Sequence, residues 1–281
     1  MIENLNQEKI KDLKLKANNI RKNIVEMLYL AKSGHTAGAL GMADIFTLLY
    51  FHQLKHKSSE PNWPNRDRLI LSNGHICPVL YATMAESGYF PIEDLKTLRK
   101  FGSKLQGHPH REFLTSLETS SGPLGEGLSQ AVGMAIALKL DNKMVSSNKI
   151  YCLLGDGELD EGQNWEALML AAKEKLSNLI IIIDRNNIQI DGNTERVMPL
   201  YDLAERFKSF NCLVQEIDGH DFEAINQAIL KAQDNYGRPA IIIAQTIPGK
   251  GVKAWENDYH WHGVAPNQAQ YEMAMEELNN A

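Results

Sequence analysis

The chain has 281 residues, with 43% hydrophobic residues, 23% charged residues and a formal net charge of −6 at pH 7. This acidic balance argues against binding to nucleic acid or to an anionic membrane, and no apolar run approaches the roughly 20 residues of a membrane helix. The N-terminal segment has no apolar signal core, and the three cysteines are scattered without zinc spacing, so we expect a reducing, cytoplasmic compartment.

The hydrophobic pattern predicts helices that alternate with strands. In chain order, the expected elements are helices over 4–32 and 41–54, a strand over 68–74, a helix over 123–140, a strand over 149–157, a helix over 162–176, a strand over 178–184, a helix over 201–210, a strand over 212–217, a helix over 221–235 and a strand over 238–247. This order predicts a doubly wound α/β fold, with a mostly parallel sheet flanked by helices. Residues 1–281 are expected to form a single domain, with 265–281 a polar tail that is either a short surface helix or a cut linker.

Polar residues follow two consecutive predicted strands. Asp156 lies between Gly155 and Gly157, and Asn186 and Asn187 follow about 30 residues later, which is one strand–helix–strand repeat. Ligands of open parallel sheets bind beyond the carboxyl ends of the strands, where glycines and helix N-termini can approach an anion. A carboxylate beside an anion requires a cation between them, and oxygen ligands suit Mg²⁺ or Ca²⁺. The sequence therefore predicts a cation-bridged anion site, with two ordinary turns as the alternative.

Segments along the chain resemble the transketolase family, in the order in which that family carries them. They are SGHTAGALGMAD (33–44), DRLILSNGHICPVLYA (67–82), GHP (107–109), SGPLGEGLSQAVGMAIA (121–137), GDGELDEGQNWEA (155–167), DRNNIQIDG (184–192) and WHG (261–263). The aspartate and asparagine pattern resembles the thiamine diphosphate motif. The resemblance implies the diphosphate-binding domain of that fold, with thiamine diphosphate and Mg²⁺ or Ca²⁺ as cofactors.

The length suggests a divided enzyme. Transketolases are usually more than twice as long, because a pyrimidine-binding domain and a C-terminal domain follow the first. The chain therefore resembles the N-terminal subunit of a split transketolase, with an artificial truncation as the alternative. The resemblance implies a separate C-terminal subunit that carries the pyrimidine-binding domain, a heterotetramer of two such chains and two partners, and no catalysis by this chain alone.

The resemblance also assigns the cofactor residues. It implies that the Asp156 and Asn186 side chains and the backbone carbonyl of Ile188 coordinate the metal ion. Gly155 and Gly157 belong to the phosphate site, where Gly157 would donate its backbone N–H.

Two further cofactor contacts follow from the resemblance. Gly122, Pro123 and Leu124 would form a backbone wall beside the aminopyrimidine. Glu161 would join an acidic network across the subunit interface, although a glutamate in the first turn of a helix is equally well explained by the helix dipole.

Four histidines fall within the matching segments. The resemblance implies that His35 and His262 contact substrate hydroxyls and move protons, and that His108 binds the first hydroxyl of the donor's two-carbon unit. His75 and His262 would also lie near the diphosphate. Imidazole suits these roles because it titrates near neutral pH.

The other histidines have simpler explanations. His52 and His56 flank a predicted helix end and are expected at the surface. His220 precedes Asp221, a good helix cap, and is expected to have a structural role.

The substrate is less well specified than the cofactor. Thr36 stands where the family often has proline, and His110 follows GHP where the family usually has an acidic residue. Phosphosugars are the expected substrates, from the pentose phosphate pathway or from a specialised one. Two alternatives stay open: the α subunit of a thiamine diphosphate-dependent 2-oxoacid dehydrogenase, against which LSNGH and GPLGEGLSQAVGMA argue, and a non-catalytic scaffold.

Overall fold

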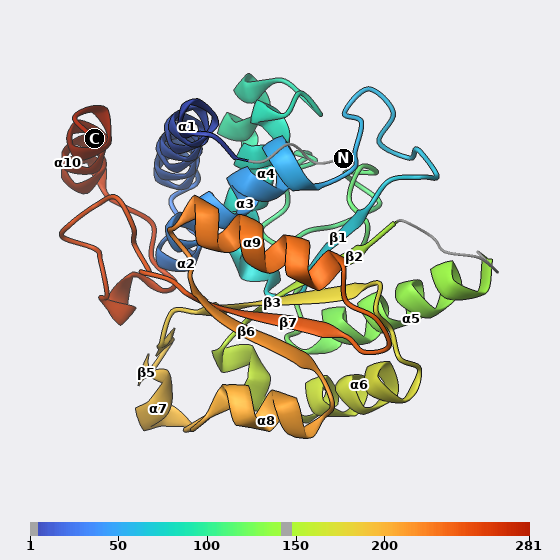
Figure 1. Cartoon of the computed structure of the whole chain (residues 1–281). Coiled ribbons are helices and arrows are strands. Elements are labelled where there is room, and N and C mark those ends of the chain that lie inside the picture. The colour runs from blue at the N-terminus through green and yellow to red at the C-terminus, as the bar shows by residue number, and fades with distance from the viewer. Residues whose placement is uncertain (1–4, 142–147) are drawn as a thin grey trace.

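The computed structural model describes residues 5–141 and 148–281. Its central layer is a five-stranded sheet in the order β1-β2-β3-β7-β6, in which every neighbouring pair is parallel (Figure 1). The strands are β1 (Arg68–Leu71), β2 (Ile150–Gly155), β3 (Leu179–Arg185), β6 (Leu213–Asp218) and β7 (Ala240–Gln245). The predicted parallel α/β fold is confirmed.

Apolar side chains on both faces of the strands explain the sandwich of layers. In β3, Ile180 and Ile182 belong to the core on one face of the sheet, whereas Ile181 and Ile183 belong to the core on the other. All four are buried. A strand covered on both faces needs this continuous apolar run, because successive side chains point to opposite sides.

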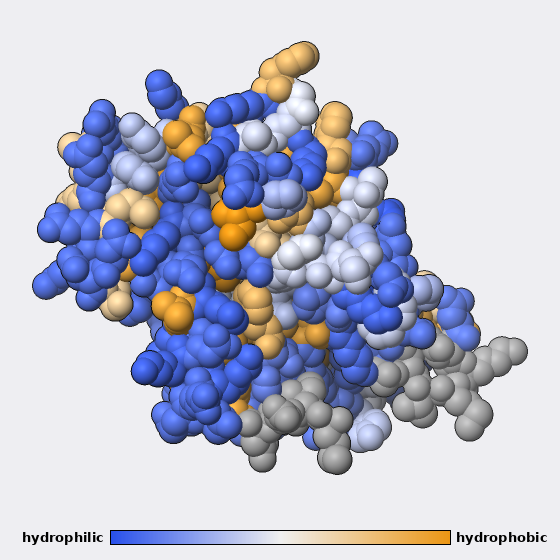
Figure 2. Space-filling view, turned by 90° about the horizontal axis from the view of Figure 1, so that it is seen from above, coloured by the Kyte–Doolittle hydropathy of each residue, from blue (hydrophilic) through white to orange (hydrophobic). Residues whose placement is uncertain are grey.

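Helices cover the two faces of the sheet, as Figure 1 shows. One layer contains α1 (Gln7–Ala31), α2 (Ala37–Gly41), α3 (Ala43–Leu48), α4 (Cys77–Glu86), α9 (Phe222–Gln233) and α10 (Gln268–Asn279). The other contains α5 (Glu126–Asp141), α6 (Gly162–Lys173) and α8 (Leu203–Ser209). Seen from above the first layer, the surface is mostly hydrophilic, with apolar side chains in small groups (Figure 2).

Shorter elements connect these helices and strands. A hairpin of β4 (Ile188–Gln189) and β5 (Gly192–Asn193) follows β3 and leads into α7 (Thr194–Val197). Single 3₁₀ turns cover Gly74–Ile76, Ile92–Thr97, Gly157–Asp160 and Tyr259–Trp261. No helix in the described ranges is long and apolar enough to cross a bilayer.

The helix expected over 41–54 is interrupted. It consists of α2, α3 and a π-helical turn over Leu49–Gln53. A Cβ on Gly41 would lie 2.9 Å from the carbonyl oxygen of Ile247, so the loop after β7 packs directly on the backbone at the break. The hydrophobic pattern indicates burial here but carries no sign of this contact.

The C-terminal segment is a packed helix rather than a linker. α10 begins at a capping box formed by Asn267 and Gln270, and Leu278 is fully buried. Tyr271 stacks on Tyr29 of α1, with ring centroids 4.4 Å apart. Of the two expectations for this segment, the structure shows the helix.

Candidate cofactor site

A cavity of about 310 Å³ lies at the carboxyl ends of β1, β2 and β3. All but two of the predicted site residues line it: His35, His75, His108, Gly122, Leu124, Gly155, Asp156, Gly157, Asn186, Ile188 and His262. The exceptions are Pro123 and Glu161, which are exposed outside the lining. Glu161 lies next to Gly125, where a Cβ would come 2.8 Å from the Glu161 Cβ.

Asp156 follows the last residue of β2 and is almost fully buried. Its Oδ1 accepts a hydrogen bond from the backbone N–H of Gly157 at 2.8 Å. Its Oδ2 accepts from Arg185 Nη1 at 3.0 Å and from the backbone N–H of Asn187 at 2.8 Å. Burial raises the pKa of Asp156, and the Arg185 guanidinium opposes that rise. The carboxylate is thus held in one orientation at the strand end.

Asn186 reaches the same cavity from the neighbouring strand, because Gly155 of β2 pairs with Asp184 of β3. The Asn186 amide donates from Nδ2 to Asp184 at 2.8 Å, and its Oδ1 accepts from the backbone N–H of Ile188 at 3.0 Å. Burial, together with the charge of Asp156, raises the pKa of Asp184 to about 7. The juxtaposition expected from one strand–helix–strand repeat is present.

The four predicted histidines form one cluster from four separate segments. The centroid of the His35 ring lies 4.9 Å from that of His75, 5.6 Å from His262 and 6.3 Å from His108. The His75 and His262 rings are 5.2 Å apart. His35 precedes α2, His75 lies in the turn after β1, and His262 follows the 3₁₀ turn that ends at Trp261.

The cluster favours neutral imidazoles. Burial lowers the pKa of His35 to about 4, with further lowering by the charges of His262, Arg99 and His108. Burial also lowers the pKa values of His75, His108 and His262. A neutral imidazole carries one donor and one acceptor nitrogen. The cluster can therefore both donate to and accept from the hydroxyl groups of a ligand.

Glu158, which sequence reasoning missed, holds together the chain segments around the cavity. The side chain is buried and lines the cavity. Its carboxylate accepts from the Ser72 hydroxyl, from the backbone N–H of Gly125 at 2.7 Å and from that of Gly155 at 3.1 Å. Glu158 therefore joins the ends of β1 and β2 to the loop before α5. Two of its partners, Ser72 and Gly125, are distant in sequence, so no local pattern marks it as buried.

Asn73, also missed, points to a ligand. It lies just after β1 and lines the cavity, and both polar atoms of its side chain are buried with no hydrogen-bond partner in the described part of the chain. Buried polar groups are normally paired. The sequence signal that could have identified Asn73 is its position in LSNG, at the end of a predicted strand.

The donor set fits a bound diphosphate with a hard divalent cation. Carboxylate, amide and carbonyl oxygens of Asp156, Asn186 and Ile188 border one cavity, and such oxygens are the ligands of Mg²⁺ and Ca²⁺. Glycine backbone lies beside them, and the side chain of Asn73 is left unpaired among the described residues. Within residues 5–141 and 148–281, no three His, Cys, Asp or Glu side chains are arranged so that they could hold a metal ion by themselves. An ion here would thus depend on mixed oxygen ligands.

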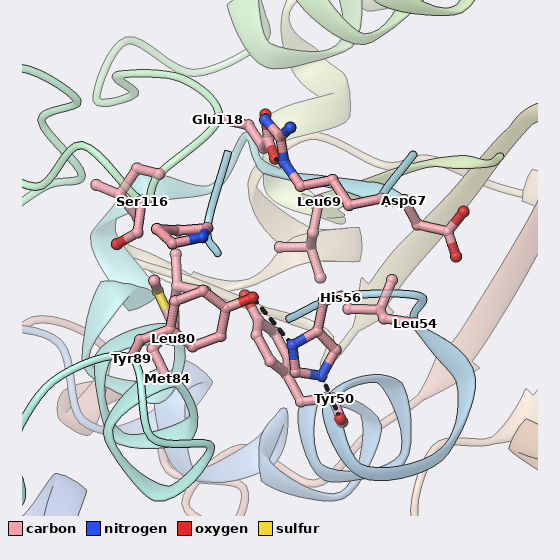
Figure 3. A pocket seen from close by; sticks show the side chains of 13 residues that line it. Tyr50, Leu54, His56, Asp67, Leu69, Leu80, Met84, Tyr89, Ser116 and Glu118 are labelled. Atoms are coloured by element: carbon pink, nitrogen blue, oxygen red, sulfur yellow. Dashed lines mark hydrogen bonds and ion pairs between the residues drawn. The ribbon is translucent and has the colours of Figure 1, made fainter. Parts of the chain in front are cut away.

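A second, small cavity of about 30 Å³ lies elsewhere, between Tyr50, His56 and Tyr89 (Figure 3). His56 is half-buried, with Nδ1 2.9 Å from the Tyr89 hydroxyl and Nε2 2.7 Å from the Tyr50 carbonyl oxygen. The expectation that His52 and His56 are surface residues is wrong, because both are half-buried. Both ring nitrogens of His56 serve the fold.

His220 has the structural role that the sequence suggested. Its Nδ1 lies 2.7 Å from Asp44 Oδ2, and its Nε2 accepts from the backbone N–H of Ile247 at 2.8 Å. Asp44 also pairs with Arg21. This buried group joins α1 and α3 to the loop after β7.

Together, the parallel sheet and the cavity at its carboxyl edge define an α/β domain that binds a small-molecule cofactor. The chain belongs to the transketolase family, since residues 13–279 match the family model "Transketolase, thiamine diphosphate binding domain".

Two short relatives match almost end to end. The 6-deoxy-6-sulfo-D-fructose transketolase subunit of Clostridium sp. (strain MSTE9) is 40% identical, over 95% of this chain and 96% of its own length. An apulose-4-phosphate transketolase subunit of Phocaeicola vulgatus is 39% identical, over 96% of this chain and 95% of its own length.

Full-length transketolases match over their first part. The Campylobacter jejuni transketolase structure is 38% identical with a TM-score of 0.89, and the match covers 96% of this chain but 43% of that one. Human transketolase is 38% identical, over 97% of this chain and 43% of its own length. The chain thus spans less than half of these proteins and nearly all of the two short relatives.

Proposed function

We propose that this chain is the thiamine diphosphate-binding subunit of a two-chain transketolase. The observation that carries the proposal is a single cavity in which Asp156 and Asn186, from neighbouring strand ends, face a cluster of four histidines. The chain's near-complete match to two proteins named as transketolase subunits supports the division of the enzyme into two chains.

In this proposal, Asp156, Asn186 and the carbonyl of Ile188 hold Mg²⁺ or Ca²⁺ on the diphosphate, and Gly157 donates its backbone N–H. The cation neutralises an anion that an acidic chain could not hold by bulk charge. Bound thiamine diphosphate supplies the nucleophilic carbon that carries a two-carbon ketol unit from a ketose phosphate to an aldose phosphate.

The histidine cluster supplies proton transfer and orientation. We propose that His35 and His262 contact substrate hydroxyls and move protons, that His108 binds the donor's first hydroxyl, and that His75 and His262 lie near the diphosphate. Burial keeps these imidazoles neutral, and the Nδ1 atom of His35 is buried without a partner in the described residues. A neutral imidazole can receive a hydroxyl proton and later return it.

The partner in this proposal is a chain that carries the pyrimidine-binding domain, in a heterotetramer. Glu161 lies exposed outside the cavity lining, which is consistent with an acidic network across the subunit interface, and Pro123 would border the aminopyrimidine with Gly122 and Leu124. On α6, Met169 and Leu170 are also exposed, although both are large and apolar. The three cysteines are free and buried, in keeping with a reducing, cytoplasmic compartment.

The substrates we propose are phosphosugars. The names of the two short relatives specify a sulfonated sugar and a phosphorylated one, so the family permits different anionic sugars. No observation favours a 2-oxoacid dehydrogenase over transketolase. A non-catalytic scaffold would be expected to have lost ligands, yet the metal-site residues and all four histidines line the cavity.

Reconstitution tests the proposal. The purified chain, mixed with the chain that carries the pyrimidine-binding domain, should transfer a ketol unit between phosphosugars when thiamine diphosphate and Mg²⁺ are present. Either chain alone should be inactive, and Asp156→Ala should abolish the activity of the mixture. Full activity of this chain alone, or activity of the mixture that survives Asp156→Ala, would contradict it.

A further inference from the structure

Arg185, the last residue of β3, is buried between two carboxylates. Its Nη1 lies 3.0 Å from Asp156 Oδ2, and its Nη2 lies 2.6 Å from Glu195 Oε1. Arginine is rarely buried unless it is paired. The planar guanidinium presents its donors in a fixed fork, so one side chain can hold both acids at once.

The hydrogen bonds of Asp156 are divided unevenly between its two oxygens. Oδ2 accepts from Arg185, from the backbone N–H of Asn187 at 2.8 Å and from the Thr194 hydroxyl at 3.3 Å. Among the described residues, Oδ1 accepts only from the backbone N–H of Gly157. Because a carboxylate has about four acceptor positions, Oδ2 is saturated whereas Oδ1 keeps capacity for one more partner.

Glu195 extends this contact to the segment after the β4–β5 hairpin. Besides Arg185, it accepts from the backbone N–H groups of Leu200 and Tyr201, each at 3.2 Å. Tyr201 has a φ of 55°, in the left-handed region that non-glycine residues rarely adopt. Arg185 thus connects Asp156 to a turn whose backbone is held by Glu195.

We propose that Arg185 is a positioning residue: together with the Asn187 N–H and the Thr194 hydroxyl it occupies Oδ2 of Asp156 and fixes the carboxylate, so that Oδ1 is presented to the cation of the proposed diphosphate site. This inference rests on the proposed function. Glu195 completes the arrangement, because it accepts from Nη2 of Arg185 and balances the guanidinium charge.

A purely electrostatic view predicts the opposite sign. A positive charge near a cation site repels the cation, so removal of Arg185 would strengthen cation binding if charge alone mattered. If positioning dominates, removal weakens binding, because the carboxylate can rotate. Loss of such supporting contacts typically lowers metal affinity about 10-fold to 100-fold. The direction of the change therefore decides between the two effects.

The test compares Arg185→Met and Arg185→Lys with Arg21→Met. Arg21 is an equally buried arginine that pairs with Asp44 outside the cavity, with Nη2 2.6 Å from Asp44 Oδ2. Thermal unfolding of the full chain is followed while Mg²⁺ is titrated at saturating thiamine diphosphate. We expect Arg185→Met to need about 10-fold to 100-fold more Mg²⁺. Arg185→Lys should also bind more weakly, since an ammonium cannot bridge both acids in a fork.

The control should lose thermal stability but keep the wild-type Mg²⁺ requirement. Amide hydrogen exchange at Asn187 gives a readout that needs no cofactor, because this N–H donates to the oxygen that Arg185 holds. We expect faster exchange in both Arg185 variants and no change in Arg21→Met. If Arg185→Met does not fold, Arg185→Lys carries both measurements.

Unchanged or tighter Mg²⁺ binding by the Arg185 variants would overturn the inference. If the wild-type chain shows no Mg²⁺-dependent cofactor binding, the proposed function fails. The exchange measurement then still judges the positioning of Asp156: wild-type exchange at Asn187 in the variants would refute it, and accelerated exchange would support it.

Discussion

Glu158 joins three backbone segments around the cavity, and its replacement by glutamine keeps the shape while it removes the charge. In the native chain, Oε1 accepts from the Ser72 hydroxyl and the Gly125 N–H, and Oε2 accepts from the Gly155 N–H. The amide oxygen of glutamine can replace only one of these atoms. Its NH₂ group would face a donor at the other.

The cost follows from this geometry. The amide oxygen should keep the Oε1 position, which has two donors, so that the Gly155 N–H loses its partner. An unsatisfied buried donor costs about 1–3 kcal/mol, and each remaining bond loses charge assistance of about 1 kcal/mol. Burial of the carboxylate is itself unfavourable and raises the pKa of Glu158. The neutral glutamine avoids this penalty, which offsets part of the lost stability. We expect Glu158→Gln to lower the free energy of unfolding by about 3 kcal/mol.

Urea unfolding of the cofactor-free chain at pH 7 measures the change. Glu161→Gln is the matched control, because Glu161 is exposed and only three residues further along the chain, and its effect should stay below about 0.5 kcal/mol. In a double-mutant cycle with Ser72→Ala, the two substitutions should be non-additive. If Glu158→Gln costs less than about 1 kcal/mol, or the cycle is additive, the carboxylate does not hold the cavity in this way.

Three further predictions concern the fold. In α5, Gly127→Ala should destabilise the chain by about 1–3 kcal/mol in urea unfolding, because the new Cβ would lie 2.5 Å from the Cβ of Ser72. Gly133→Ala in the same helix should stabilise the chain by up to about 1 kcal/mol, because its Cβ would meet no heavy atom within 4 Å. Effects of equal sign would contradict the packing. The pKa of His35 is lowered to about 4 in the folded chain, from an ordinary value of 6.5, so stability should fall as the pH drops from 6.5 towards 4, and His35→Gln should reduce that slope; an unchanged slope would refute a buried neutral imidazole. Leu278→Ala should cost about 2–5 kcal/mol, because α10 buries this side chain fully; a loss below about 0.5 kcal/mol would make the helix an independent tail.

The sequence is most informative where a pattern is local. The continuous apolar run in β3 requires cover on both faces, and the structure places that strand at Leu179–Arg185, within a residue of the expected 178–184. The glycines, acids and asparagines that end β2 and β3 predict a shared edge, since parallel strands that are paired in register end together. These features depend on neighbours in the chain, so one sequence suffices to find them.

The residues that were missed depend on contacts that no local pattern records. Glu158 bonds to Ser72, which is 86 residues away, and Arg185 bonds to Asp156 across 29 residues. A charged residue in sequence is expected at the surface, so nothing marks either one as buried. The break between α2 and α3 likewise lies at a contact that is distant in sequence, where the loop after β7 packs against Gly41.

The central claim is that a divalent cation links Asp156 and Asn186 to the diphosphate of a bound cofactor. The most direct measurement is thermal unfolding of the wild-type chain with thiamine diphosphate plus Mg²⁺, and with the cofactor plus a chelator. A ligand that binds only the folded state raises the unfolding temperature. We expect a rise that needs both components and disappears in Asp156→Ala. No rise at saturating concentrations, or an equal rise with the chelator, would contradict the account.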